Sequence, residues 1–114
     1  MECTETAQDG LVILNLKGEI DLQFSPALRK ILQEKLKAKC PALVIDFSGV
    51  EYIDSSGLAT LVEYRRDSRK YEGAVALANL NNRVRTIFEL VRLNEIIPIY
   101  PTLEEARTGI KTKP

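Results

Sequence analysis

The sequence predicts an α/β domain whose mixed, mostly parallel sheet of four to five strands is flanked by about four helices. Short aliphatic runs alternate with amphipathic helical segments, and this alternation favours parallel strands joined by right-handed crossovers. The run at residues 42–47 is nearly all apolar, which is typical of a strand covered by helices on both faces. The length of 114 residues, without linker or repeat, predicts a single domain over residues 1–114.

The aliphatic run at residues 11–16 predicts a strand, because Gly10 and Gly18 punctuate its two ends. The residues before it are a candidate partner strand, with Asp9-Gly10 as the hairpin turn. This N-terminal pair would be antiparallel.

The first helix is predicted to start at Ser25-Pro26, with Ser25 as its N-cap and Pro26 at its first position. Pro41 ends it. Apolar residues recur along it at the three-four spacing of a core-facing stripe, namely Phe24, Ala27, Leu28, Ile31, Leu32 and Leu36.

After the buried strand at residues 42–47, Ser48-Gly49 predicts a turn, and a second helix opens at Asp54-Ser55-Ser56-Gly57. Its apolar stripe is expected to consist of Leu58, Leu61 and Val62. Beyond Tyr64 the helix becomes basic and should face water until Gly73 ends the segment.

The last third of the chain repeats the alternation. A short buried strand at residues 75–78 precedes a third helix, capped by the asparagines that surround Leu80, with Val84, Ile87, Phe88 and Val91 on one face. Residues 96–100 predict an edge strand broken by Pro98. Thr102 and Glu105 form a capping box for a final helix that Gly109 is expected to end, before a frayed tail at residues 111–114.

Composition argues against several classes of function. Lysine plus arginine and aspartate plus glutamate each number 16, so the net charge is zero, which disfavours a nucleic-acid or acidic-membrane binder. A local basic cluster at Arg65, Arg66, Arg69 and Lys70 fits a solvated helix face. The chain has no histidine, so the commonest general base and the commonest metal ligand are missing. This excludes the cheapest enzymatic chemistries but not every enzyme. Our prediction is no enzyme, no catalytic residues, no metal site and no cofactor.

Localisation is predicted from what the sequence lacks. No signal-peptide pattern opens the chain, and no apolar run approaches the ~20 residues of a membrane span. Cys3 and Cys40 fit two reduced thiols rather than a disulfide framework. These features predict a cytoplasmic protein without membrane contact.

The segment most informative about function is Asp54-Ser55-Ser56-Gly57, where a strand gives way to a helix. Sites in alternating α/β folds gather at the carboxyl ends of strands, and a helix N-terminus receives a phosphate well. Asp54 or Ser55 could equally be a plain helix cap, and the two interpretations are compatible. Asp21 is expected on the same surface, or as an ordinary loop residue. A pair of carboxylates, Asp46 and Asp54, for acid–base chemistry or Mg²⁺ ranks lower.

Three segments together resemble the STAS family, the sulphate-transporter and anti-sigma-factor-antagonist domains. They are Gly18-Glu-Ile-Asp21, Leu43-Val-Ile-Asp-Phe-Ser-Gly-Val50 and Tyr52-Ile-Asp-Ser-Ser-Gly-Leu58, in that order and spacing. The likeness is greatest to the stand-alone bacterial antagonists and covers about residues 10–106. The chain departs from the family pattern at Ile20, at residues 22–25, and in the basic second half of the helix that contains Leu58.

The resemblance implies a mechanism called partner switching. The unphosphorylated antagonist binds an anti-sigma factor that is also a serine kinase, and a sigma factor is released. The kinase phosphorylates the serine directly after the Asp of Asp-Ser-Ser-Gly, here Ser55. Binding is then abolished, and a serine phosphatase resets the switch. By position, Asp54 supports Ser55, Asp21 lies at the kinase-facing surface, and Ser56, Gly57 and Leu58 open the helix that the partner contacts.

Three other functions remain open at this stage. The chain could be the STAS subunit of a bacterial phospholipid ABC transporter, which binds its ATPase constitutively. A nucleotide-binding or weakly hydrolytic protein ranks lower, because no Gly-x-x-x-x-Gly-Lys loop occurs. The cytosolic domain of a membrane transporter ranks last, because the chain starts at Met1.

Overall fold

A computed structural model describes residues 2–8 and 10–111. The described chain forms five strands, β1 (Glu2–Gln8), β2 (Leu11–Ile20), β3 (Ala42–Ile53), β4 (Ala74–Ala78) and β5 (Ile99–Tyr100). Its four α-helices are α1 (Ser25–Lys37), α2 (Ser55–Ser68), α3 (Asn82–Leu90) and α4 (Leu103–Lys111), and two 3₁₀ turns are η1 (Arg69–Tyr71) and η2 (Leu93–Glu95).

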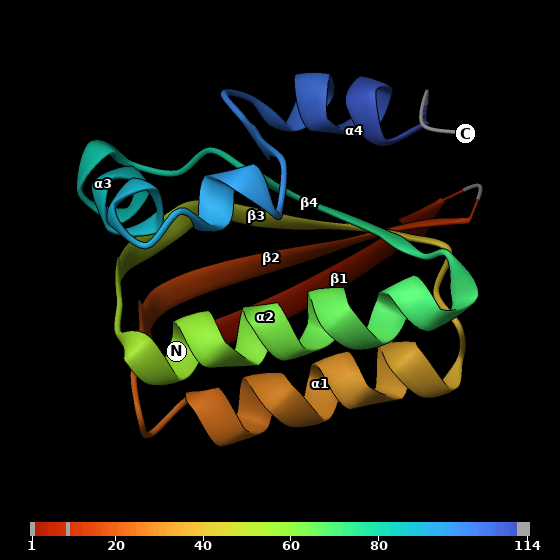
Figure 1. Cartoon of the computed structure of the whole chain (residues 1–114), viewed down its shortest axis with the longest axis horizontal. Coiled ribbons are helices and arrows are strands. Elements are labelled where there is room, and N and C mark those ends of the chain that lie inside the picture. Colours follow the sequence, from red (N-terminus) through yellow and green to blue (C-terminus); the bar gives the residue numbers. More distant parts are fainter. Residues whose placement is uncertain (1, 9, 112–114) are drawn as a thin grey trace.

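The sheet has the order β1-β2-β3-β4-β5. The β1–β2 pair is antiparallel and the other three pairs are parallel, which confirms the predicted mixed, mostly parallel sheet. Helices α1 and α2 lie side by side on one face of the sheet, and α4 lies on the other (Figure 1). The predicted turn residue Asp9 lies outside the described residues.

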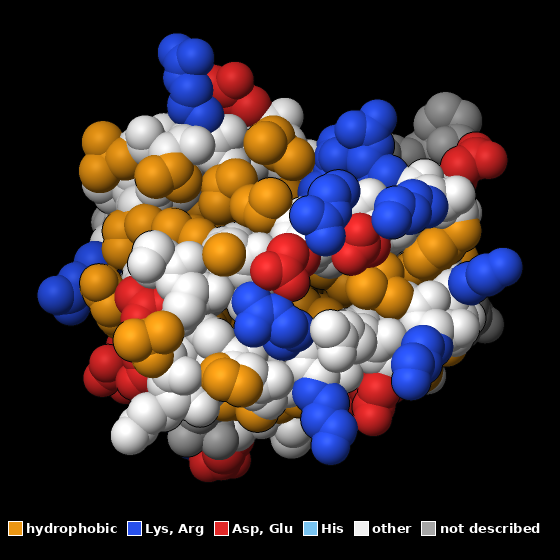
Figure 2. All heavy atoms as spheres, turned by 60° about the horizontal axis from the view of Figure 1, so that its bottom comes forward, with side chains coloured by type: hydrophobic (Ala, Val, Ile, Leu, Met, Phe, Trp, Pro, Cys, Tyr) orange, Lys and Arg blue, Asp and Glu red, His pale blue; other side chains and the backbone are white. Residues whose placement is uncertain are grey.

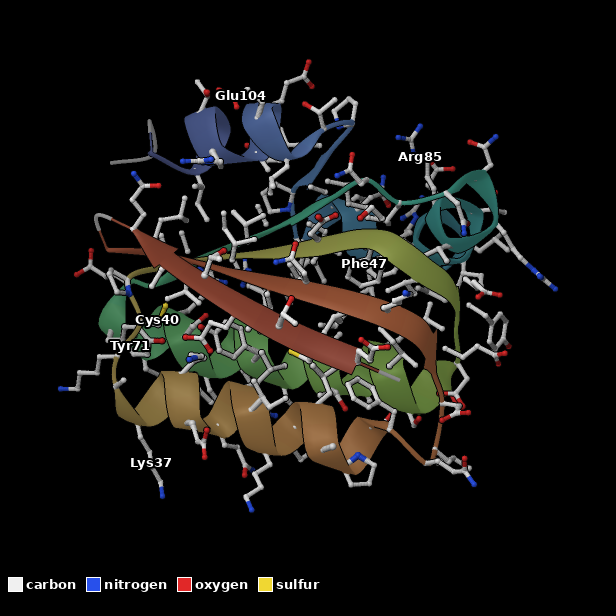
Figure 3. All side chains as sticks on the ribbon, turned by 180° about the vertical axis from the view of Figure 1, so that it is seen from behind. Lys37, Cys40, Phe47, Tyr71, Arg85 and Glu104 are labelled. Atoms are coloured by element: carbon white, nitrogen blue, oxygen red, sulfur yellow. The ribbon has the colours of Figure 1, made fainter. Side chains whose placement is uncertain are left out.

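Alternating side chains of the central strands enter two separate cores. Leu43, Ile45 and Phe47 of β3 belong to the larger core beneath α1, α2 and α3, whereas Val44 joins the smaller core beneath α4. Phe47, labelled in Figure 3, lies on β3. Its ring meets that of Phe88 of α3 edge to face, with ring centroids 6.0 Å apart. A strand buried on both faces explains the nearly continuous apolar run of the sequence.

The predicted turn at Ser48-Gly49 is wrong, because β3 continues through it to Ile53. The register of β3 against β2 shifts twice, between Asn15 and Lys17 and between Gly18 and Glu19, so β3 gains residues by bulging while it keeps its partner. A Cβ on Gly49 would lie 2.9 Å from the carbonyl oxygen of Leu16, so the glycine permits this close approach. The bulged extension carries the chain directly to the start of α2.

Several predicted helix details also change. Ser25 is the first residue of α1 and not its side-chain cap, since no side-chain hydrogen bond caps this helix. The buried stripe of α2 consists of Gly57, Thr60, Leu61, Tyr64 and Ser68, so Val62 lies off it and is exposed. Ala27 and Val91 are exposed as well, the latter because α3 already ends at Leu90.

The C-terminal elements differ from prediction at two points. Of residues 96–100 only Ile99–Tyr100 is a strand, because Ile96 ends η2 and Pro98 has no N–H for a ladder bond. The predicted position at the sheet edge is confirmed. Helix α4 runs past Gly109 to Lys111, and Gly109 packs against the Tyr100 ring instead of ending the helix. The predicted frayed tail lies outside the described residues from 112 onward. Within residues 2–8 and 10–111, no helix combines the length and apolarity that crossing a membrane requires.

Candidate functional site

Asp54 is the N-cap of α2. Its Oδ1 accepts hydrogen bonds from the backbone N–H of Ser56 (2.9 Å) and Gly57 (3.2 Å) and from the hydroxyl of Ser56 (2.5 Å). The Ser56 hydroxyl bond, followed by the backbone donors, lowers the pKa of Asp54 although partial desolvation opposes this. The Asp54 N–H donates to the carbonyl of Ile20 at 3.0 Å, so the cap is tied to the end of β2. The carboxylate is therefore held ionised in one position.

Ser55 is the first residue of α2 and is exposed. Among the described residues, no partner forms a hydrogen bond with its hydroxyl, in contrast to that of the neighbouring Ser56. The carboxylate of Asp54, rather than Ser55, caps the helix, so the hydroxyl of Ser55 is not needed for folding. An exposed, unengaged hydroxyl at a helix N-terminus is open to chemical modification.

Ser56 connects the two helices that lie side by side. Its Oγ is 2.7 Å from the Oγ of Ser25, which in turn lies 2.8 Å from the carbonyl oxygen of Asp21. Each hydroxyl has one proton, so one consistent arrangement has Ser56 donating to Asp54 and Ser25 donating to Ser56 or Asp21. Ser25, interpreted from the sequence as a cap, is 2% exposed and links the starts of α1 and α2.

Asp21 fixes the loop between β2 and α1. Its Oδ1 accepts from the backbone N–H of Gln23 (3.0 Å) and Phe24 (3.1 Å), which replaces the cap that Ser25 was expected to provide. The sequence analysis expected Asp21 on the same surface as Ser55. Polar contacts run from the backbone carbonyl of Asp21 through Ser25 and Ser56 to Asp54, the residue before Ser55. Asp21 also borders a hollow of about 430 Å³ with two further acids, Glu19 and Glu51.

Gly57 and Leu58 follow the exposed serine. Gly57 is buried, and a Cβ there would lie 2.6 Å from Ile20 Cγ2 and 2.7 Å from Ile53 Cγ1, so the glycine lets the start of α2 approach the sheet. Leu58 is half-buried and packs against the larger core. Both residues thus set the height of Ser55 above the sheet.

Leu22 was not selected as a site residue in the sequence, yet it is 74% exposed in the loop beside Asp54. Its backbone N–H also helps to lower the pKa of the Asp54 carboxylate. The signal that could have found it is an apolar residue placed between the polar Asp21 and Gln23, before the first helix begins.

Asp46 does not join Asp54. It is 8% exposed and accepts from the backbone N–H of Ser48 (2.9 Å) and the side-chain amide of Asn79 (3.1 Å), so its contacts stabilise the end of the first part of β3. Within the part of the chain that the structure describes, no group of three or more His, Cys, Asp or Glu residues could hold a metal ion. The geometry gives no support to the paired-carboxylate alternative.

The fold and the site together define a domain of the STAS class, and the chain belongs to the STAS domain family, whose model matches residues 4–106. Relatives with curated names are anti-sigma factor antagonists. The chain is 33% identical over 111 residues to the anti-sigma-F factor antagonist RsfB of Mycobacterium tuberculosis, covering 95% of this chain and 88% of the relative. It is 35% identical over 86 residues to the anti-sigma-B factor antagonist of Bacillus subtilis, covering 75% and 78%.

A solved structure agrees with these sequence relatives. The crystal structure of an anti-sigma factor antagonist from Mycobacterium paratuberculosis superposes with a TM-score of 0.89 at 31% identity, covering 96% of this chain and 93% of that one. The relatives carry the names of regulatory antagonists, and none of these names is that of an enzyme.

Proposed function

We propose that this chain is an anti-sigma factor antagonist that works by partner switching in the cytoplasm. In its unmodified form it binds an anti-sigma factor that is also a serine kinase, and a sigma factor is set free. Phosphorylation of Ser55 abolishes this binding, and a serine phosphatase restores it. The names of the relatives support the general role.

The single observation that carries the proposal is the exposure of the Ser55 hydroxyl beside a cap that does not need it. In the transfer step, the Ser55 oxygen forms a bond to the γ-phosphorus of ATP, the bond to ADP breaks, and the hydroxyl proton passes to a base of the kinase. The product carries a charge of about −1.5 to −2 at the N-terminus of α2, where the helix dipole tolerates an anion.

The surroundings of Ser55 explain why the phosphoryl group would evict the partner. Asp54 is ionised next to it, and Asp21, Glu19 and Glu51 add negative charge nearby. A partner docked on this surface must complement its negative charge before modification. After modification the same interface would also have to desolvate the phosphoryl dianion, and binding is lost. In this proposal Asp21, Asp54, Ser56 and Leu58 form the contact surface, and Gly57 positions it from below.

The test is incubation of the purified chain with candidate anti-sigma factor kinases of its source and ATP, followed by mass spectrometry. We expect one phosphoryl group on Ser55, none on the Ser55→Ala variant, and unchanged labelling of Ser48→Ala, a variant of another exposed serine. Ser55→Ala should bind the kinase permanently and Ser55→Asp should bind it at least about tenfold more weakly. Full modification of Ser55→Ala would refute the assignment.

A further inference from the structure

A second surface lies at the other end of α2. We name it the arginine surface, and it consists of Val62, Arg65, Arg66, Arg69 and Ile96, which line a hollow of about 440 Å³. Arg65, Arg69 and Ile96 also border an adjoining hollow of about 450 Å³ on the side of β4. The two hollows share Arg65, Arg69 and Ile96, so together they form one continuous concave area at this end of α2.

The floor of the arginine surface is apolar. Val62 and Ile96 are 37% and 43% exposed, large hydrophobic side chains that neighbouring elements leave uncovered. The Nε–H of Arg65 donates to the carbonyl of Ile96 at 3.2 Å, which fixes the guanidinium beside this floor. In the view of Figure 2, hydrophobic side chains gather toward the upper left of the face, and lysines and arginines gather toward the right.

The charges of the arginine surface are only partly balanced. Arg66 and Lys70 both pair with Asp67, at 3.0 Å and 3.5 Å. Within residues 2–8 and 10–111, no carboxylate forms a salt bridge with Arg65 or Arg69, although Glu72 borders the adjoining hollow. Desolvation and the repulsion from Arg69 lower the pKa of Arg65, so these two guanidiniums raise each other's free energy. A carboxylate placed between them would relieve that repulsion.

We propose that the arginine surface binds an acidic, amphipathic segment of a protein partner. Carboxylates of the segment pair with Arg65 and Arg69, and an apolar side chain covers Val62 and Ile96. A free phosphate would leave the apolar floor exposed. A nucleic acid or an anionic membrane would meet a chain of zero net charge with acids at the opposite end of the same helix.

The position of this surface suggests which partner it serves. Arg65 follows Ser55 by ten residues of α2, or about 15 Å of helix. The exposed side of α2 thus runs from an acidic end, near Asp21 and Asp54, to a basic end. A partner lying along α2 must present the opposite sequence of charges, which fixes its direction. The identification of this partner as the anti-sigma factor rests on the proposed function. The existence of the arginine surface does not depend on it.

The test uses the full chain and a synthetic helical peptide with glutamate and leucine on one face, followed by amide chemical shifts in NMR. We expect saturable shifts at residues 62–73 and 96–98. A peptide with glutamine in place of glutamate, and one with serine in place of leucine, should each bind about tenfold more weakly. Arg65→Gln/Arg69→Gln should weaken binding of the acidic peptide to a similar extent, whereas Arg83→Gln/Arg85→Gln, a basic pair of α3, should not.

Arg69→Gln alone provides a variant that keeps the bond between Arg65 and Ile96, in case the double variant is poorly folded. Shifts spread over all basic regions, or displacement of the peptide by millimolar inorganic phosphate or a short oligonucleotide, would overturn the proposal. If no candidate kinase phosphorylates Ser55 but the acidic peptide still binds, only the proposed function is refuted. If Ser55 is phosphorylated but the acidic peptide does not bind, only this inference is refuted.

Discussion

The hydroxyl oxygens of Ser25 and Ser56 lie 2.7 Å apart, and this contact joins the first turn of α1 to the first turn of α2. Ser25 is otherwise anchored to the carbonyl of Asp21, and Ser56 to the carboxylate of Asp54. A continuous line of polar contacts thus runs from the backbone carbonyl of Asp21 through the two hydroxyls to the carboxylate of Asp54, and Ser55, the residue after Asp54, takes no part in it. Rigid surroundings and a free hydroxyl are what a modification site without a folding role requires.

Ser25→Ala should destabilise the domain by about 1 kcal/mol. The change removes a buried hydroxyl, and with it the contacts to the carbonyl of Asp21 and the hydroxyl of Ser56. The bond from Ser56 to Asp54 can persist, so the cap of α2 should survive. Urea denaturation measures the free energy of unfolding. Ser48→Ala, a change at an exposed serine of β3, is the control and should stay within about 0.5 kcal/mol of wild type. Equal stabilities of the two variants would show that the hydroxyl pair contributes nothing.

Asp54→Asn should change how stability depends on pH. The pKa of Asp54 is lowered in the folded state, so the ionised carboxylate stabilises the fold fully above the unfolded pKa of about 3.9. That contribution is lost as the pH falls through the lower folded pKa. The wild type should therefore be more stable than the variant at pH 6, and the difference should shrink as the pH drops below about 4.

The pH experiment compares urea midpoints of the two proteins between pH 7 and pH 2.5. Glu51→Gln serves as the control. It removes a nearby exposed acid whose side chain forms no hydrogen bond within the described residues. A constant difference between wild type and Asp54→Asn over the whole range would contradict the cap geometry. A pH-dependent difference for Glu51→Gln of the same size would show that general charge, and not the cap, is responsible.

Gly57→Ala sets two effects against each other. Alanine is favoured over glycine by about 1 kcal/mol in a helix interior, and by less at Gly57 because this residue lies in the first turn of α2. The added methyl would lie 2.6 Å from Ile20 and 2.7 Å from Ile53, and overpacking of this kind costs about 1–3 kcal/mol. Both neighbours are fully buried, so they have little room to move, and we expect net destabilisation.

Thermal unfolding followed by circular dichroism measures the result. Ala59→Gly, at an exposed position of the same helix, is the reciprocal control and should lose about 1 kcal/mol through propensity alone. A rise in melting temperature for Gly57→Ala would mean that α2 can shift away from the sheet, and that Gly57 does not set the position of Ser55.

The parts that the sequence could predict are those governed by side-chain pattern. Leu43, Ile45 and Val44 sit on opposite faces of β3 because a strand alternates, and the apolar run already indicated burial on both sides. Asp54-Ser55 was recognisable as a helix start because the residue types there are strong caps. These features depend on neighbours in the sequence alone.

The parts that failed depend on distant neighbours. Ser48-Gly49 has turn chemistry, but pairing with β2 up to Ile20 overrides it and turns the signal into a bulge. Ser25 resembles a cap, but Asp21 satisfies the loop N–H groups first and frees Ser25 to bond with Ser56. Val62 was assigned to the core because it is apolar. The buried stripe does contain the expected Leu61, but it continues through Gly57, Thr60 and Ser68, which a stripe chosen by hydrophobicity alone omits.

Leu22→Ala should weaken binding to the anti-sigma factor without weakening the fold. Leu22 is 74% exposed beside Asp54, so truncation removes little buried area from the free protein, and its stability should stay within about 0.5 kcal/mol of wild type. An exposed leucine next to the candidate site would be buried only when a partner docks, and loss of such an anchor should reduce affinity about tenfold. Leu90→Ala is a matched control, because Leu90 is 79% exposed at the end of α3. Calorimetric titration with the kinase that phosphorylates Ser55 separates the two leucines: equal losses would indicate a nonspecific apolar contact, and an unchanged affinity for Leu22→Ala would remove this loop from the interface.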